Sequence, residues 1–245
     1  MNRKTRLTIS IISAIVLLAC ACPVSSLPAI GTPPATNAPV IPTAQLQNPT
    51  AAQQNANILY TDDFSSASSE LESFSDESGS GETKDGVYVL RSTSDVWNWG
   101  QSDSEFGNTV IEFDTTITVG PANNNAGAGV ICRMVVREDK SIDGYLLAIS
   151  GDGFYSIRSI TSSSMDPLVD WTLSDIVNQG NQVNKIRATC NGSELILEVN
   201  GKILATANAT ASGPQSGKFA FAAISFETDE QVAEVHFDNL TISEP

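Results

Sequence analysis

The chain has 245 residues, with 28 Asp and Glu against 13 Lys and Arg, which gives a formal net charge of −15 at pH 7. This acidity argues against nucleic-acid binding, because proteins that bind a phosphate backbone need a basic patch. It also argues against docking of the folded surface on anionic lipid. With one histidine, the chain lacks the residues for a histidine metal cluster or a serine–histidine–aspartate triad.

The first 19 residues have the pattern of an export signal. Three basic residues precede an apolar run from Leu7 to Ala19, which is short for a bilayer span of about 20 residues. The run ends in Leu17-Leu18-Ala19-Cys20, which resembles the lipobox of bacterial lipoproteins. That resemblance implies cleavage before Cys20, lipid attachment to its thiol, and anchoring to a bacterial membrane on the extracytoplasmic side of the cell envelope. An ordinary secretory signal, with Cys20 incidental, is the alternative.

Residues 20–57 form a second segment with its own composition. From Ala21 to Leu59 there is no charged or aromatic residue, and seven of the eleven prolines of the chain lie there. Such a segment cannot bury enough apolar surface to offset the entropy cost of ordering. We therefore expect a disordered, partly polyproline-II tether. A leader with no spacing role is the alternative.

Residues 58–245 are expected to form one all-β domain. The alternation of apolar and polar residues is clearest over Thr109–Val119, and Asn200-Gly201 suits a two-residue type I′ turn. Leu173–Gln179 is the one segment with helical character. Many short strands with regular turns predict a two-sheet antiparallel jelly-roll sandwich. The other predicted strands are Gly86–Arg91, Ala128–Val136, Gly144–Ser150, Phe154–Ile160, Val183–Asn191, Glu194–Asn200, Lys202–Ala207, Lys218–Phe226 and Val232–Ile242.

Short motifs follow one another along this domain in a recognisable order. They are Asp62-Asp63-Phe64, Gly86-Val87-Tyr88, Trp97, Gly129-Val130-Ile131-Cys132-Arg133, Asp143-Gly144-Tyr145, Gly151-Asp152-Gly153-Phe154-Tyr155, Asn184, Cys190-Asn191-Gly192, Val199-Asn200-Gly201 and Phe237-Asp238-Asn239. Their order resembles the concanavalin A-like lectin/glucanase superfamily, in particular its laminin-G-like and bacterial domain-of-unknown-function branches. The resemblance implies two curved antiparallel sheets, with the first and last strands side by side. It also implies a concave face of the kind that often binds glycans.

The closest catalytic pattern in this superfamily is Glu-x-Asp-x-x-Glu on a strand, with a nucleophile first and an acid/base last. Retaining hydrolysis needs two carboxyl groups about 5–5.5 Å apart. Here Glu112 and Asp114 occupy the first two positions, but Ile117 stands where the acid/base belongs. Without a proton donor the leaving group departs poorly, so we expect no enzyme activity. Glu112 and Asp114 are then either sugar contacts or ordinary residues on the solvent-facing side of a strand.

Two cysteines remain after Cys20 and Cys22 in the sequence. Cys132 and Cys190 both lie in predicted strands of an exported chain, where disulfides persist. A bridge between them would close a long loop and stabilise the fold by roughly 4 kcal/mol in the chain-entropy model. We expect this disulfide. Two buried free thiols are the alternative.

The resemblance also points to a structural calcium ion, because related sandwiches often carry one. Asp62, Asp63 and Asp238 supply oxygen ligands from the two ends of the domain, which the resemblance places together. The sequence contains no Asp-x-Asp-x-Asp-Gly loop. A domain without any cofactor is therefore the alternative.

Sugar binding needs flat aromatic rings beside planar polar groups. Trp97 and Trp99 lie two residues apart on one face of the same segment, and Trp171 and Tyr145 are further candidates. Arg133 is a candidate contact for a hydroxyl or carboxylate. The alternative for each aromatic residue is a place in the core, where such side chains are usually buried.

The leading hypothesis is a membrane-anchored, non-catalytic module that binds a polysaccharide or other glycan. The second is a glycoside hydrolase-like enzyme that acts on exported sugars, which a cluster of carboxylates on the concave face would favour. The third is a structural or protein-interaction domain without a small ligand, which a concave face free of exposed aromatic residues would favour.

Overall fold

The computed structural model describes residues 57–245, except 67–68, 94, 163 and 229–230. The predicted signal segment, Cys20 and the predicted tether up to residue 56 lie outside the described residues. The lipid anchor and the tether therefore stay predictions. Within the described residues, no helix has the length and apolar character needed to cross a membrane.

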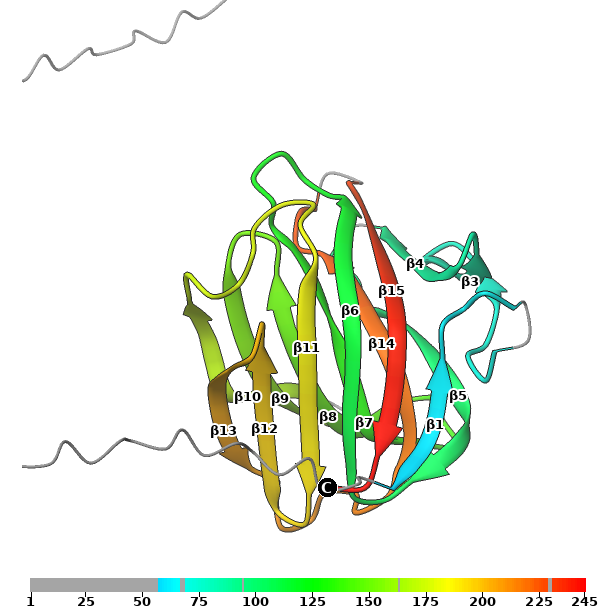
Figure 1. Cartoon of the computed structure of the whole chain (residues 1–245), viewed down its shortest axis with the longest axis vertical. Coiled ribbons are helices and arrows are strands. Elements are labelled where there is room, and N and C mark those ends of the chain that lie inside the picture. Colours follow the sequence, from blue (N-terminus) through cyan, green and yellow to red (C-terminus); the bar gives the residue numbers. More distant parts are fainter. Residues whose placement is uncertain (1–56, 67–68, 94, 163, 229–230) are drawn as a thin grey trace, which may run out of the picture. The chain divides into compact units, whose positions relative to one another are not determined.

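The described part of the chain folds into fifteen strands in two antiparallel sheets that lie one behind the other (Figure 1). The nine-stranded sheet has the order β13 (Lys202–Asn208), β12 (Glu194–Val199), β11 (Asn184–Asn191), β6 (Thr109–Val119), β15 (Val232–Ser243), β4 (Val87–Thr93), β3 (Gly79–Lys84) and β2 (Phe74–Ser75), with β1 (Ile58–Asp62) also paired to β15. The six-stranded sheet has the order β10 (Ser164–Leu173), β9 (Phe154–Thr161), β8 (Ile142–Ser150), β7 (Ala126–Val136), β14 (Gly217–Ser225) and β5 (Asn98–Phe106).

The core lies between the two sheets and is built from alternate residues of each strand. Along β6, Ile111, Phe113, Thr115 and Ile117 are buried, while Glu112, Asp114 and Thr116 between them are partly exposed. The Phe113 ring lies 4.9 Å from that of Phe221 on β14, which stacks at 4.1 Å on Phe237 of β15. Each such buried side chain contributes about 1.5–3 kcal/mol. These aromatic contacts pack the two sheets against each other.

A disulfide joins the two sheets within this core. Cys132 on β7 is bonded to Cys190 on β11, and both residues are buried. The predicted disulfide is therefore present. The pairing of β1 with β15 also places the first and last strands side by side, as the resemblance implied.

All ten predicted strands are present, with ends within two residues of the prediction. The predicted helix at Leu173–Gln179 is wrong. Leu173 ends β10, and the chain then makes turns in which the Ser174 hydroxyl oxygen accepts the N–H of Ile176. A serine at this position stabilises a local turn as readily as a helix start. The prediction missed the strands β1, β2, β3, β5 and β10.

Candidate functional site

The six-stranded sheet carries apolar side chains on both of its faces. One face belongs to the core, and the opposite face holds a second buried apolar cluster. An antiparallel sheet in a sandwich ordinarily presents polar residues on its outer side. We call this outer surface of the six-stranded sheet the aromatic face. It consists of Ile131, Met134, Ile142, Leu146, Ala148, Ile160, Ala220 and Ala222, with Trp97, Trp99, Met165 and Trp171 packed against them.

Strand register places a row of small residues across the middle of the aromatic face. Trp99 on β5 is paired with Ala222 on β14, which is paired with Gly129 on β7. The row continues to Ala148 on β8 and Ser156 on β9. Ala222, Gly129, Ala148 and Ser156 have short side chains or none, so the tryptophan side chains of the aromatic face extend further from the sheet than this row does.

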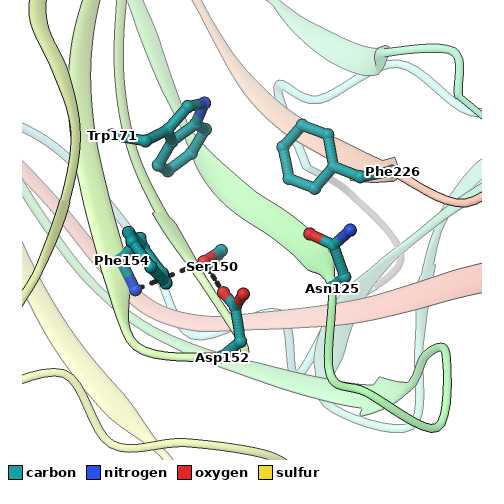
Figure 2. Close-up of a pocket in the computed structure, with 6 residues that line it drawn as sticks. All are labelled: Asn125, Ser150, Asp152, Phe154, Trp171 and Phe226. Atoms are coloured by element: carbon teal, nitrogen blue, oxygen red, sulfur yellow. Dashed lines mark hydrogen bonds between the residues drawn. The ribbon is translucent and has the colours of Figure 1, made fainter. Parts of the chain in front are cut away.

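A pocket of about 320 Å³ lies at one end of this sheet, beside the turn that joins β8 to β9. This volume is at the lower end of the range for small-ligand sites. Four different parts of the chain supply its walls (Figure 2). The lining residues are Asn125, Ser150, Asp152, Phe154, Trp171 and Phe226.

The rings of Phe154, Trp171 and Phe226 form the apolar side of this pocket. Trp171 and Phe226 meet edge to face, with ring centroids 5.5 Å apart and an interplanar angle of 84°. Trp97, which does not line the pocket, makes a similar contact with Phe226, with ring centroids 5.9 Å apart. A side chain on Gly127 would come within 3.1 Å of both Trp97 and Phe226, so a glycine there gives the rings room. All three tryptophans of the chain thus lie on the aromatic face.

The polar side of the pocket is held by a short chain of hydrogen bonds. The Ser150 hydroxyl donates to the Asp152 carboxylate and accepts the N–H of Phe154. The Asn125 amide donates to Glu227 at 3.0 Å. Hydrogen bonds from Asn123 and Asn125 lower the pKa of Glu227. In Figure 2 the amide oxygen of Asn125 and the Asp152 carboxylate face the space between the rings.

The structure brings together only some of the residues that the sequence suggested. Trp171 lines the pocket, Trp97 packs against its Phe226 wall, and Trp99 lies further along the aromatic face. Sequence analysis missed the contributions of Asn125, Ser150, Asp152, Phe154 and Phe226. A signal was present in β8 and β14, because both read as apolar on both faces rather than alternating. A strand of that kind is covered on both sides.

Two candidate sugar contacts lie inside the protein, which corrects the expectation for both. Tyr145 is fully buried in the core. Arg133 is 2% exposed, and its guanidinium donates to the carbonyl oxygens of Gly192 (2.8 Å) and Cys190 (3.0 Å) and to Asn108 (2.9 Å). Burial lowers the pKa of Arg133. The apolar residues around Arg133 correctly predicted that it lies on a strand. They did not indicate that its side chain is buried and bonded to residues of two turns.

Glu112 and Asp114 lie on the outer face of the other sheet. Their partners are residues of the neighbouring strand β11: Glu112 contacts Arg187 at 3.0 Å, and Asp114 contacts Lys185 at 3.3 Å. The core separates these residues from the tryptophans. The sequence placed all of them among the sugar contacts, whereas the structure divides them between two opposite faces.

The three aspartates suggested as calcium ligands lie near the pairing of β1 with β15. The Asp62 carboxylate accepts bonds from the Tyr60 hydroxyl (2.7 Å) and the Phe64 N–H (2.8 Å), and that of Asp63 accepts bonds from Ser65. Asp238 accepts the N–H of the next residue. Among the described residues, no group of three or more His, Cys, Asp or Glu side chains is placed to hold a metal ion. Calcium binding stays a prediction.

Solved structures with the same arrangement of sheets include a carbohydrate-binding module, CBM66, from Bacillus subtilis, at a TM-score of 0.54 and 14% identity over 68% of this chain and 92% of that one. They also include a Bacillus licheniformis β-glucanase, at 0.53 and 12% over 78% and 100%. The chain has the concanavalin A-like jelly-roll fold.

A Bacillus subtilis protein of unknown function with a galectin-like fold matches at a TM-score of 0.59 and 10% identity, over 77% of this chain and 96% of that one. No protein-family model matches the sequence, and no curated protein matches it. At these identities the likeness concerns the fold, so the concanavalin A-like jelly roll supplies the scaffold and the site must supply the function.

Proposed function

We propose that this chain is a membrane-anchored, extracytoplasmic lipoprotein that presents a non-catalytic, glycan-binding jelly roll. The observation that carries the proposal is the pocket of the aromatic face. It combines the rings of Trp171, Phe226 and Phe154 with the polar atoms of Asn125 and Asp152. Sugars present apolar C–H faces and hydroxyl groups in alternation, so a ring wall beside hydrogen-bonding groups suits them.

The carboxylates of the chain support a binding role rather than hydrolysis. Among the six residues that line the pocket, Asp152 is the one carboxylate, whereas retaining and inverting glycosidases use a pair. The Glu112–Asp114 pair lies on the opposite sheet, where basic side chains of β11 hold both residues in ion pairs. Neither place combines an acid/base with a nucleophile beside the aromatic rings.

The sequence before the domain supports the anchor. Leu17-Leu18-Ala19-Cys20 ends a short apolar run, and the segment that follows is rich in proline. A lipid on Cys20 would hold the chain at a membrane, while the segment of residues 20–57 would carry the jelly roll away from it. The acidic chain would then remain in solution above the anionic lipid surface.

A glycan array tests the binding role most broadly. The full chain, purified in a detergent without a sugar headgroup, is applied with and without a calcium chelator. We expect reproducible binding of at least one glycan class and loss of that binding in Trp171→Ala. A blank array from a correctly folded chain would overturn the glycan proposal. Loss of binding with the chelator would support the calcium prediction.

The anchor has a separate test in cells. The natural chain is expected in the membrane fraction, labelled by a fatty-acid analogue that carries a chemical reporter. Cys20→Ser is expected to remove the label, because the thiol that carries the lipid is lost. Cys22→Ser is the matched control and is expected to keep the label. A label that survives in Cys20→Ser would contradict the anchor.

A further inference from the structure

We propose that the sugar held in the pocket of the aromatic face carries a free, positively charged amino group. This inference rests on the proposed function and narrows it to amino sugars. The juxtaposition that carries it is the Asp152 carboxylate facing a corner made by Trp171 and Phe226, in a pocket whose inward polar atoms accept hydrogen bonds rather than donate them.

The side chains that line the pocket leave acceptors open and use their donors elsewhere. The Ser150 hydroxyl spends its proton on Asp152, and the Asn125 amide nitrogen donates to Glu227. What remains toward the pocket is the amide oxygen of Asn125 and the Asp152 carboxylate. In Figure 2 the indole nitrogen of Trp171 lies on the side of the ring away from Asp152.

Four backbone donors around the pocket are used as well. In the turn between β8 and β9, the N–H of Gly151 donates to Ala126 and that of Gly153 to Ser150. The N–H of Phe154 donates to the Ser150 hydroxyl, and that of Phe226 donates to the Asn125 carbonyl. The open acceptors of the pocket therefore suit a ligand that brings donors of its own. An ammonium group brings three donors and no acceptor.

The rings favour a cation for a second, independent reason. The π faces of tryptophan and phenylalanine carry negative potential and attract an ammonium group within about 6 Å of the ring centre. Trp171 and Phe226 stand at 84° to each other, so two faces can approach one charge from different directions. A carboxylate opposite aromatic walls is the arrangement by which proteins hold ammonium groups in aromatic cages.

The charge of the surroundings points the same way. The chain has a net charge of −15, and Asp152 and Glu227 both lie at this end of the sheet. Arg158 is the cation that β9 contributes on the same side, and its guanidinium is bonded to Ser156 (3.4 Å) and the Met165 carbonyl (3.2 Å) instead of the pocket. None of the six lining residues is basic, so an acidic sugar would meet the Asp152 carboxylate without a compensating charge from them.

The test compares ligands that share a sugar ring and differ at one substituent, which is charged in only one of them. Binding of the full chain to a glucosamine tetramer, an N-acetylglucosamine tetramer and a glucose tetramer is measured by calorimetry in about 0.15 M salt, where long-range attraction is screened within roughly 8 Å. N-acetylation removes the charge while the ring remains. We expect the glucosamine tetramer to bind at least tenfold more tightly than either neutral tetramer.

Two variants separate the pocket from general acidity. Asp152→Asn is expected to weaken glucosamine binding at least tenfold, and the asparagine keeps an oxygen that can accept the Ser150 hydroxyl. Asp85→Asn removes the same charge from the exposed turn between β3 and β4, at a positive backbone angle that asparagine tolerates. That control is expected to bind within about twofold of the natural chain, because it leaves the pocket intact.

The possible outcomes distinguish the two proposals. Equal or tighter binding of a neutral tetramer, lost in Trp171→Ala, would overturn the amino-sugar inference and keep the glycan-binding function. Equal weakening in Asp152→Asn and Asp85→Asn would overturn the inference by assigning the attraction to net charge. If no tetramer binds and the glycan array is also blank, both proposals fall.

Discussion

The outer faces of the two sheets differ in the kind of side chain that they present. On the nine-stranded sheet, acidic and basic side chains of neighbouring strands pair with each other, as Glu112 does with Arg187 and Glu234 with Arg91. On the six-stranded sheet the corresponding surface is apolar, with three tryptophans and a floor of small residues. On the nine-stranded sheet the ion pairs Glu112–Arg187, Asp114–Lys185 and Glu234–Arg91 join neighbouring strands.

The aromatic face, by contrast, keeps rings beside water at the edge of a pocket. Partly exposed aromatic rings that line a pocket are typical of small-ligand sites. The contrast between the two faces supports the binding role proposed for the aromatic face. It also separates the tryptophans from the Glu112–Asp114 pair, which share a predicted role in the sequence but lie on opposite faces of the molecule.

The largest expected effect comes from removing the disulfide that joins the two sheets. Replacing Cys132 and Cys190 together by alanine should lower the free energy of unfolding by about 4 kcal/mol, because a separation of 58 residues is no longer closed in the unfolded chain. Urea denaturation of the natural and double-variant chains measures the difference. A difference below about 1 kcal/mol would mean that packing alone holds the sheets together.

Arg133 provides the next largest effect. Arg133→Met should cost about 3 kcal/mol, because it leaves the buried carbonyl oxygens of Gly192 and Cys190 without their donor. Arg137→Met removes an arginine from the exposed loop after β7 and should cost less than about 1 kcal/mol. Equal losses in the two variants, measured by the same denaturation, would contradict the structural role assigned to Arg133.

Binding should respond to the aromatic face alone. Trp171→Ala should weaken glycan binding at least tenfold, or about 1.4 kcal/mol, because one ring wall of the pocket is removed. Leu173→Ala changes a residue on the same strand that is 62% exposed and does not line the pocket, and it should bind like the natural chain. Calorimetry with the glycan found on the array measures both variants. Equal weakening in both would indicate a general effect on β10.

Whether a strand could be predicted from the sequence depends on its position in the sheet. Strand β6 alternates cleanly because one side meets the core and the other meets water, so its pattern in the sequence carries its fold. Strands β5 and β10 escaped prediction because they edge the six-stranded sheet; β5 is largely polar, and β10 contains Pro167 and lacks regular alternation. An edge strand has fewer neighbours to impose a pattern.

The pocket was harder to predict than the fold. Trp171 was a candidate from its residue type, but its partners Asp152, in the β8–β9 turn, and Phe226, just after β14, meet it only through the pairing of β14, β7 and β8. The role of Arg133 was predicted wrongly for the same reason. Its guanidinium is held by residues from the β5–β6 and β11–β12 turns, and no local pattern reveals that contact.

Substitutions on the outer face of the nine-stranded sheet should change both stability and binding only slightly. Arg187→Ala breaks the contact with Glu112, in which both side chains are about half exposed, and should cost less than about 1 kcal/mol. Glycan binding should stay within about twofold of the natural value. A tenfold loss of binding in Arg187→Ala would move the site to the nine-stranded sheet and break the comparison.

The smallest effect concerns the acid that supports Asn125. The pKa of Glu227 is lowered in the folded chain by hydrogen bonds from Asn123 and Asn125. Its contribution to stability is therefore present above the unfolded pKa of about 4.3 and is lost as the pH falls through the lower folded value. The difference in unfolding free energy between the natural chain and Glu227→Gln should shrink between pH 6 and pH 3. A constant difference would show that those hydrogen bonds do not favour the charged acid.

Tryptophan emission gives the most direct test that the aromatic face is the binding surface, because all three tryptophans of the chain lie there. The full chain is titrated with the soluble oligosaccharide that the array selects, and calorimetry is run in parallel. A saturable change in emission at the calorimetric affinity, absent in Trp171→Ala, is the predicted result. Calorimetric binding that leaves the emission unchanged would place the ligand elsewhere and contradict the account.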